Sequence, residues 1–551
     1  MKKMASETET EVEEKKKEPQ GVSEVEEKKK EPQGVSEAAT RNLMQSIRAK
    51  VEAACLGEVE EKEVEIIPEA LVIGGGIAGM YASLDIADAG FKVHLVERTP
   101  TIGGHMAQLD KTFPTLDCSA CILTPRMVDV SKHKNINLMS YSEVVGVEGS
   151  IGNFTVKVKR KPRYVIEATC TGCSLCEEAC RFAGKFPNEF DENLGKRGSI
   201  YRPFPQAIPA VYCVDPERCQ MVKKGKCGKA TIENVRAYLK EGKEDLEVPP
   251  CIAICGPNAI DFDMEERIEE YKVGTIIVAT GFDILDPKEM PEYKYGKLPN
   301  VITGLEFERY SNAAGPTFGK IIVQGVDRLP KDAVFISCVG SRNKQTGHEY
   351  CSRVCCMYIA KQAHLLGEKV PDCTITVLYQ DVRAFGKGFE EFYDRVKGEG
   401  LNYKRGLASE VYQMPGSDRV IVRGEDTMLG EPFELEADIV VLGVGLQPTA
   451  GTAELLQMLG IEETSDHFAK EAHPKLRPVD TDVPGVFVTG CVQSPKDIPD
   501  SVAQGKAAAA GSLALLTRGK VVLRQPVSEM EEELCLGYKS LKEMADKVGA
   551  A

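Results

Sequence analysis

The sequence lacks the long apolar stretches that enter or cross membranes. No apolar run reaches the roughly 18 residues of a membrane span, and the first residues show no apolar core of the kind that secretory signals carry. We therefore expect a cytoplasmic protein with no membrane span. Disulfide cross-links are disfavoured in that compartment, so the 19 cysteines are more naturally metal ligands than cross-links.

A large basic block is also missing. The formal net charge is −15, which argues against nucleic acid as a partner. The chain of 551 residues is too long for a single hydrophobic core. Its length predicts about two to four domains.

Residues 1–40 contain few apolar residues and many charged ones, and the segment VEEKKKEPQGVSE occurs twice, at Val12–Glu24 and at Val25–Glu37. Such a composition cannot bury enough apolar surface to offset the chain entropy lost on folding. We predict a disordered charged tail, with a partner-binding arm as the alternative. Residues 41–66 follow as a short amphipathic helix, Arg41–Cys55, and a linker.

The first strong motif lies in Ala70–Glu97, where an apolar strand leads into Gly74-x-Gly76-x-x-Gly79, a helix of small residues and a second strand. Gly74 permits the tight turn, Gly76 lets the backbone approach a pyrophosphate, and Gly79 allows the helix to pack closely on the strand. The helix N-terminus attracts phosphates, and Glu97 can accept hydrogen bonds from ribose hydroxyls. The complete pattern predicts a dinucleotide site.

The identity of the dinucleotide is indicated by later segments. Arg98–Gln108 contains a second glycine pair, Thr275–Asp283 is a strand ending in Ala-Thr-Gly, and Ile439–Pro448 gives another strand. Gly485–Gly511 adds a strand, a Thr-Gly turn and a helix of small residues. These pieces resemble the two-dinucleotide-fold flavoprotein family, with a discontinuous FAD domain. The resemblance implies FAD contacts at Gly74, Gly76, Gly79, Glu97, Arg98, Gly104, Thr280, Gly281, Gly490, Asp497 and Ile498.

One position departs from the flavoprotein pattern. Cys491 stands where the family usually has an aspartate beside the glycine. The contact to the ribityl phosphate then passes to backbone amides or to the loop that contains Asp497 and Ile498.

A cysteine-rich insert separates the early and late FAD segments. Its first half, C-x2-C-x2-C-x3-C, has the bacterial ferredoxin spacing, in which three cysteines hold one cubane cluster and the fourth crosses to the other. A chance pattern or a zinc site is the alternative. We expect the ligands to be Cys170, Cys173, Cys176 and Cys180 in the first half and Cys219, Cys227, Cys251 and Cys255 in the irregular second half. We expect Cys255 to complete the first cluster and Cys180 the second, with Cys213 as a spare and a helix inserted between Cys227 and Cys251.

The second dinucleotide-binding unit should begin at Asp332–Ser337 and continue through a helix at Tyr350–Leu366. Its turn, CVGSRN, has no glycine fingerprint, so this unit has given up nicotinamide binding. It carries instead a C-x12-C-x3-C-C pattern made of Cys338, Cys351, Cys355 and Cys356. Thiolates packed this densely suit an iron–sulfur cluster or zinc. A cluster beside the flavin would let electrons pass between the two.

The remaining cysteines are less informative. Cys118 and Cys121 form a C-x2-C pair, which can be redox-active, can bind metal or can be structural. Cys55, Cys373, Cys491 and Cys535 are interpreted singly as ordinary small apolar residues.

Six segments together resemble the A subunits of heterodisulfide reductases, the iron–sulfur flavoproteins of methanogens, also found in sulfate reducers and other anaerobes. These segments are FPTLDCSACILTPRMVDV, GKRGSIYRPFPQAIP, FISCVGSRN, YCSRVCCMYIAKQA, DVRAFGKGFEEFY and SPKDIPDSVAQ. The resemblance implies a 4Fe–4S cluster on the C-x12-C-x3-C-C set and two more in the insert. It also implies that Lys361 approaches the flavin ring, where a cation would stabilise the reduced flavin. A solvated helix lysine is the alternative.

The predicted fold class is α/β, a thioredoxin-reductase-like flavoprotein with two dinucleotide-binding domains and an inserted bacterial-type ferredoxin domain. The FAD-binding domain is expected in three parts, at 67–165, 263–312 and 435–520. The ferredoxin insert covers 166–262, and the second Rossmann-like domain covers 313–434. Longer family members have an additional N-terminal domain and a C-terminal ferredoxin domain, and residues 521–551, with Cys535 and Tyr538, are expected to be a degenerate remnant of the latter.

The resemblance implies an oxidoreductase subunit that passes electrons between a donor module, FAD and three 4Fe–4S clusters, with electron bifurcation at the flavin left open. No residues stand out as an acid–base pair or nucleophile for disulfide cleavage, which is assigned to a separate subunit. The implied partners are B- and C-like heterodisulfide reductase subunits and a hydrogenase, formate dehydrogenase or deazaflavin-dependent dehydrogenase, around a homodimer. The alternatives are the equivalent subunit of a quinone-interacting or aromatic-acyl-CoA-reducing complex, and a non-catalytic scaffold with structural clusters.

Overall fold

The computed structural model describes residues 59–242, 245–323 and 328–526. Residues Glu63–Val522 form one compact unit. Strands β1 (Val59–Glu65) and β28 (Lys520–Pro526) pair with each other. The expected tail at 1–40, the helix Arg41–Cys55 and the expected remnant around Cys535 lie outside the described residues. Among the helices that are described, none combines the length and apolar composition needed to cross a bilayer.

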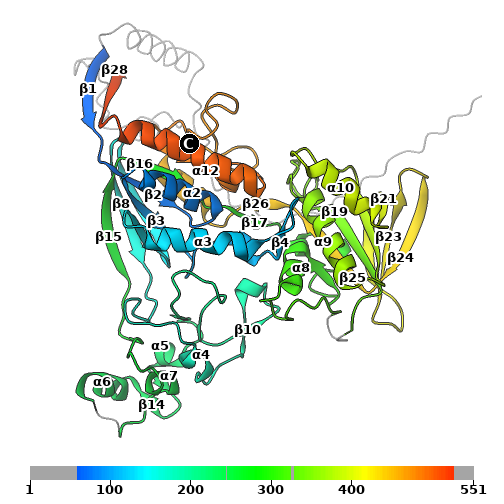
Figure 1. The fold of residues 1–551 in the computed structure, drawn as a ribbon, viewed down its shortest axis with the longest axis horizontal. Helices are drawn as coiled ribbons and strands as arrows, with labels where there is room; N and C mark the ends of the chain where they lie inside the picture. Colours follow the sequence, from blue (N-terminus) through cyan, green and yellow to red (C-terminus); the bar gives the residue numbers. More distant parts are fainter. Residues whose placement is uncertain (1–58, 243–244, 324–327, 527–551) are drawn as a thin grey trace, which may run out of the picture. The chain divides into compact units, whose positions relative to one another are not determined.

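A parallel five-stranded sheet forms the centre of the first domain (Figure 1). Its strand order is β27 (Val486–Val488), β16 (Thr275–Val278), β2 (Glu69–Ile73), β3 (Lys92–Val96) and β6 (Ile136–Met139). Most residues of these strands are aliphatic and buried, as expected for a parallel sheet that is covered on both faces. The sheet joins segments from all three expected parts of the FAD-binding domain.

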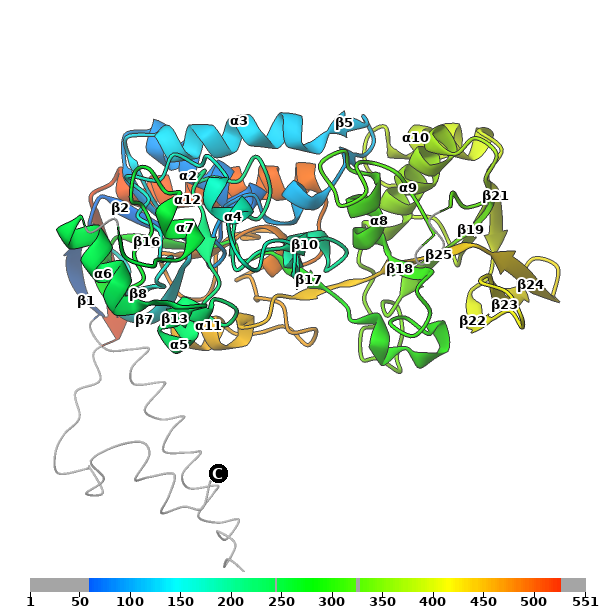
Figure 2. The same ribbon diagram turned by 90° about the horizontal axis from the view of Figure 1, so that it is seen from below.

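The two faces of this sheet are covered differently. Helices α2 (Ile77–Asp88), α3 (Ser119–Lys132) and α12 (Ile498–Leu516) lie side by side on one face, as Figures 1 and 2 show. The other face packs on helix α11 (Thr452–Leu459) and on an antiparallel sheet of β15 (Arg267–Val273), β8 (Asn153–Arg160) and β7 (Ser142–Ser150). The alternation of β2 places Val72 on the helical side and Leu71 on the other.

The cysteine-rich insert leaves and re-enters the first domain through neighbouring strands. β8 and β15 pair antiparallel, with Arg160 opposite Arg267, so the two ends of the insert lie next to each other. Inside the insert, α6 (Ile232–Glu241) is the helix that the charged sequence between Cys227 and Cys251 predicts. The other α-helices in the described residues of the insert are α4 (Leu175–Glu178), α5 (Gln220–Lys224) and α7 (Pro250–Ala253). Its short strands are β9 (Phe186–Pro187), β10 (Lys196–Arg197), β11 (Ile200–Tyr201), β12 (Cys213–Val214), β13 (Lys226–Cys227) and β14 (Ala230–Thr231).

A second parallel sheet forms the next domain. Its order is β18 (Val301–Thr303), β25 (Ile439–Val444), β19 (Asp332–Val339), β20 (Thr374–Tyr379) and β21 (Asn402–Arg405). Helices α8 (Gly304–Ser311), α9 (Cys355–Lys369) and α10 (Phe389–Gly398) accompany it, with an antiparallel sheet of β22 (Ala408–Gln413), β23 (Val420–Asp426) and β24 (Glu431–Ala437). An antiparallel pair, β17 (Phe282–Ile284) and β26 (Leu446–Pro448), links the two domains.

The membership of this sheet differs from the domain limits expected at 312 and 435. Strands β18 and β25 pair inside the second sheet, although both fall in segments assigned to the FAD-binding domain. A buried apolar strand looks the same in either parallel sheet, so only the hydrogen-bonded register shows where it belongs. Helix α9 also begins at Cys355 instead of Tyr350, after a loop in which Arg342 and Arg353 have positive φ.

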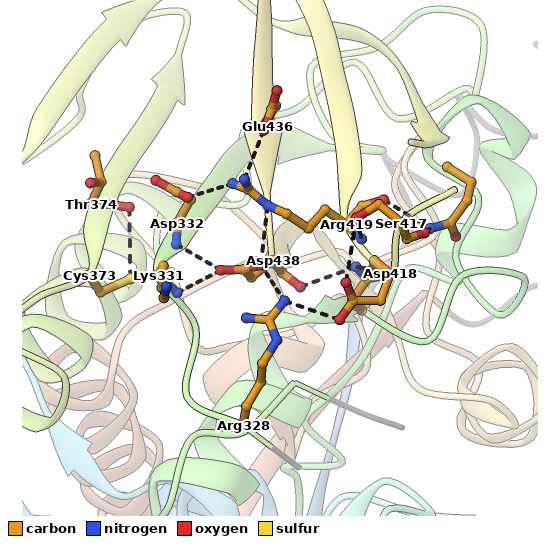
Figure 3. A network of polar contacts seen from close by, with 12 residues as sticks. Arg328, Lys331, Asp332, Cys373, Thr374, Ser417, Asp418, Arg419, Glu436 and Asp438 are labelled. Atoms are coloured by element: carbon orange, nitrogen blue, oxygen red, sulfur yellow. Dashed lines mark hydrogen bonds and ion pairs between the residues drawn. The ribbon is translucent and has the colours of Figure 1, made fainter. Parts of the chain in front are cut away.

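The start of β25 is held by a buried carboxylate. Asp438 is 1% exposed, and its oxygens accept from Arg328 Nη2 at 2.6 Å and from the Lys331 amide at 2.6 Å. Arg419 Nε lies 3.3 Å from the same carboxylate, and Figure 3 shows the groups converging on it. Asp438 thereby ties β19, β23 and β25 together at one end of the second sheet.

We predict that Asp438→Asn weakens this end of the sheet by about 2 kcal/mol, because Arg328 and Arg419 lose their buried carboxylate and keep only the more exposed partners Asp418, Asp332 and Glu436. Amide hydrogen exchange in β19 and β25 measures the loss. Glu436→Gln removes an exposed partner of Arg419 and should change stability by less than about 0.5 kcal/mol. Equal exchange in the two variants would contradict the assignment.

The same interaction predicts a pH dependence. Burial alone would raise the pKa of Asp438, but hydrogen bonds from Arg328 and from the Lys331 and Asp332 amides hold that pKa below its ordinary value of 3.8. The stabilisation is therefore present above the unfolded pKa and is lost as the pH falls through the folded one. The difference between wild type and Asp438→Asn should shrink below about pH 4.

Candidate functional site

A cavity of about 500 Å³ opens at the carboxyl ends of the strands of the first sheet. Residues of the first domain, of the insert and of the second domain line it. Of the residues predicted from sequence for FAD binding or flavin contact, all except Gly79 line this cavity. They are Gly74, Gly76, Glu97, Arg98, Gly104, Thr280, Gly281, Lys361, Gly490, Asp497 and Ile498.

The three glycines of the fingerprint have three different surroundings. Gly74 has φ +111°, and a Cβ there would lie 2.2 Å from the Ala279 carbonyl oxygen. A Cβ on Gly79 would lie 2.0 Å from the Gly74 carbonyl oxygen, so Gly79 keeps α2 close to the strand instead of lining the cavity. A Cβ on Gly76 would meet no protein atom within 4 Å and would project into the cavity. The structure therefore leaves free the space that a pyrophosphate needs at Gly76.

Glu97 is buried at the end of β3. Its two carboxylate oxygens accept from the Gly75 amide at 2.7 Å and from the Thr99 amide at 2.8 Å. These bonds fix the carboxylate at the cavity wall and leave lone pairs for further donors. Arg98 donates to the Ala450 carbonyl at 2.9 Å and lies 3.9 Å from Asp283, so it holds a neighbouring loop as well as lining the cavity.

Two hydroxyl groups in the cavity wall have no hydrogen-bond partner. Thr280 Oγ1 and Thr489 Oγ1 are both buried and unsatisfied. An unsatisfied buried polar group costs about 1–3 kcal/mol, so a polar ligand in the cavity would be favoured. The N-terminus of α12 also lies at the cavity, where Asp497 caps the helix by accepting from the Asp500 amide at 2.8 Å.

Several wall residues were not predicted from the sequence. Phe190, Tyr201 and Phe204 come from the insert, so the insert forms part of the cavity as well as carrying cysteines. His105 and Lys496 also line the cavity. His105 stacks on Phe282. Burial lowers the pKa of Lys496 to about 8. Tyr201 and Phe204 lie in the segment GKRGSIYRPFPQAIP, whose aromatic residues could have indicated a binding surface. The spacing of these residues does not show that the insert folds back onto the cavity wall.

Lys361 is buried, so it is not a solvated helix lysine. Its Nζ lies 2.7 Å from Glu308 Oε1 and donates to the Lys111 carbonyl at 2.8 Å. Glu308 is buried too, and accepts from Gln362 at 2.6 Å and from the Asp110 amide at 3.0 Å. A buried ion pair of this kind is tolerated because further hydrogen bonds satisfy both partners.

The four cysteines of the second domain are close neighbours. Burial raises the pKa of Cys338 to about 11, with a further contribution from Cys356 and Cys351. Burial also raises the pKa of Cys355 well above its ordinary value, and the other three thiolates add to it. Thiolates collected in one buried place need positive charge beside them, which the irons of a cluster would supply.

The cysteines of the insert fall into two groups. Burial raises the pKa of Cys176 to about 12, and the charges of its neighbours Cys170, Cys255 and Cys173 add to that rise. The second group lines a small cavity of about 30 Å³ and consists of Cys180, Cys219, Cys227 and Cys251. The grouping is the crossed one expected for a ferredoxin. Cys213 lies apart, fully buried beside Arg163 and Asp215.

In the ranges that the structure describes, no three His, Cys, Asp or Glu side chains converge as ligands of one metal ion.

The other cysteines are placed as follows. Cys118 and Cys121 are joined as a disulfide at the start of α3. Cys491 is buried in the cavity wall, and its Sγ donates to the Lys496 carbonyl at 3.5 Å. Cys373 is half-buried.

Known proteins are similar to this chain over part or nearly all of its length. A model of the NAD(P)-binding Rossmann-like domain matches residues 72–132. The chain is 48% identical over 508 residues to the second iron-sulfur A subunit of the CoB–CoM heterodisulfide reductase of Methanopyrus kandleri, covering 92% of this chain and 73% of that protein. It is 48% identical over 501 residues to the A subunit of the H(2):CoB-CoM heterodisulfide,ferredoxin reductase of Methanothermobacter thermautotrophicus, covering 91% and 72%.

Among solved structures, the thioredoxin reductase of T. acidophilum is 14% identical, covers 81% of this chain and 99% of its own length, and has a TM-score of 0.44. The curated relatives match nearly the whole chain at close to half identity. The chain therefore belongs to the family formed by the A subunits of heterodisulfide reductases, which are oxidoreductase subunits.

Proposed function

We propose that this protein is the FAD and iron–sulfur electron-transfer subunit of a heterodisulfide-reductase-like complex. It would relay electrons between a donor module and a separate subunit that cleaves the disulfide. Family membership supports the oxidoreductase role, and the cavity and the three cysteine groups support the cofactors.

The start of helix α9 is the observation that carries the proposal. Val354, Tyr358 and Lys361 line the large cavity, while Cys355 and Cys356 stand among them in sequence and join the buried cysteine group. A cluster held by these cysteines would therefore lie directly behind the cavity wall. Close approach of this kind is what electron exchange between two cofactors requires.

FAD supplies exchange of electron pairs and iron–sulfur clusters supply transfer of single electrons. The chain's own residues would bind and tune them. Gly76 and the N-terminus of α2 leave room for the pyrophosphate, and Glu97 would accept hydrogen bonds from the ribose hydroxyls. Thr280 and Thr489 offer unsatisfied hydroxyls, which a bound FAD would engage.

Lys361 places a positive charge in the wall at the second domain. Its ion pair with Glu308 holds the ammonium group in one position and excludes water from it. Because the Glu308 carboxylate cancels most of this charge at longer range, Lys361 would act on a cofactor group that comes close to the ammonium itself. We assign Lys361 the role of stabilising negative charge on the flavin, and Glu308 the role of positioning Lys361.

The three cysteine groups would hold three 4Fe–4S clusters. One uses Cys338, Cys351, Cys355 and Cys356, and the insert holds the other two in the crossed pattern. Relatives are named for the CoB–CoM heterodisulfide and for H(2). By that analogy we propose B- and C-like subunits as acceptors and a hydrogenase, formate dehydrogenase or deazaflavin-dependent dehydrogenase as donor, around a homodimer in the cytoplasm. Electron bifurcation at the flavin is part of the same proposal.

Anaerobic reductive titration tests the relay as a whole. In the purified protein, dithionite should bleach both the flavin and the cluster absorbance, and the cluster signals should then appear in electron paramagnetic resonance spectra. A flavin and clusters that stay oxidised under dithionite would favour a scaffold with structural clusters.

Iron analysis tests the number of clusters. The wild type should contain about twelve irons per chain, and Cys219→Ala about eight, because one cubane loses a ligand. Cys213→Ala is the matched control, since Cys213 is buried nearby but lies outside both groups, and it should keep about twelve. Loss of iron in both variants, or in neither, would refute the ligand assignment.

Substitution of Gly76 tests the FAD site. A methyl group there enters the cavity without touching protein, so Gly76→Ala should fold normally and weaken FAD binding at least about tenfold. Gly398→Ala is the control, because a Cβ at Gly398 also meets nothing but lies outside the cavity. Fluorescence titration with FAD distinguishes the two, and equal affinity would show that the pyrophosphate binds elsewhere.

A further inference from the structure

The cysteine pair at the start of α3 has no part in the proposed relay. Cys118 ends strand β5 (Asp117–Cys118), which forms a hairpin with β4 (Lys111–Thr112). Cys121 lies in the first turn of α3. The two sulfurs are paired as a disulfide with a Cα–Cα distance of 5.2 Å, within the usual range, and both residues are exposed.

The disulfide does little to hold the fold together. It joins residues only three positions apart, and closing so short a loop removes little freedom from the unfolded chain. The helix is anchored without it, because Leu123, Met127 and Val130 are buried in the core of the first domain. A structural role therefore does not account for the pair.

The position of Cys118 at the start of α3 favours the thiolate form of its side chain over the neutral thiol. Cys118 is the N-cap of a helix of 14 residues, and its sulfur accepts from the Cys121 amide at 3.3 Å. A helix N-terminus stabilises negative charge and lowers the pKa of a thiol placed there. The neighbouring carboxylate of Asp117 opposes this effect, but it accepts a hydrogen bond from Thr115.

The pair is fixed to the wall of the large cavity from two sides. Cys118 lies opposite Lys111 in the hairpin, and Lys111 lines the cavity. The Lys111 carbonyl accepts a hydrogen bond from Lys361 at 2.8 Å. Ser119 donates to the carbonyl of Met106, another wall residue, at 2.6 Å. Figure 2 shows β5 at the end of α3 that faces α10, and Phe113 of the same hairpin packs on Phe389.

We propose that Cys118 and Cys121 form a thiol–disulfide exchange site on the protein surface, in addition to the FAD and iron–sulfur relay. An incoming thiolate attacks the disulfide, forms a mixed disulfide with one cysteine and releases the other as a thiolate. A second thiol then attacks the mixed disulfide, so that two thiols become one disulfide and the pair ends as a dithiol. The reverse sequence reduces an incoming small disulfide.

Trypsin gives a direct readout of this pair. Cleavage after Lys111 and Arg126 yields the peptide Thr112–Arg126, which contains Cys118 and Cys121 and no other cysteine. The full-length protein with its clusters is incubated anaerobically with dithiothreitol or with oxidised glutathione, alkylated and digested. We expect two alkyl groups on the peptide after dithiothreitol and none after oxidised glutathione, with the change reversible over repeated cycles.

Two variants and a reference cysteine complete the test. Cys121→Ser should capture one glutathionyl group on Cys118, and Cys118→Ser should capture less, because Cys121 is not the cap. Cys373, which is alone in its tryptic peptide Val370–Arg383, should react at least about tenfold more slowly than reduced Cys118. The proposal would be overturned if dithiothreitol does not reduce the pair, or if the peptide still takes up two alkyl groups after treatment with oxidised glutathione. Neither result would affect the FAD or iron content that the relay requires.

Discussion

The structure depends on how one helix is placed between a cavity and a group of cysteines. Helix α9 follows β19 in the second sheet, and its first turn carries Cys355 and Cys356 while Val354 and Tyr358 face the cavity. Successive residues of a helix point in directions about 100° apart, so one turn can serve both sides. The buried pair of Lys361 and Glu308, two turns further on, holds the helix against the hairpin of Lys111.

The insert is accommodated by a simple constraint. Because β8 and β15 are paired neighbours, a long segment can be added between them without separating the strands of the first domain. The core of the insert is small, and seven of its cysteines lie in or against it. A domain with so little apolar core usually needs a metal or a disulfide to stabilise it, so its clusters would be structural as well as redox-active.

Local patterns were predictable from sequence, whereas contacts distant in the chain were not. The glycine fingerprint, the strands around it and the cysteine spacings each follow from neighbouring residues, and the crossed grouping of Cys180 and Cys255 follows from the ferredoxin pattern. The sheet to which β18 and β25 belong could not be predicted, because the sequence of a buried strand does not show which strand it pairs with. The wall residues Phe190 and Phe204, and the partnership of Lys361 with Glu308, depend on tertiary packing that no spacing encodes.

Electron transfer between the cavity and the cysteine group behind its wall is the centre of the proposed function. The most direct measurement is selective photoreduction of bound FAD, followed by freeze-quenching and electron paramagnetic resonance of wild type and Cys355→Ser. We expect rapid appearance of a reduced-cluster signal in the wild type and its loss or strong delay in the variant. Equal rates of cluster reduction in the two proteins would contradict the relay.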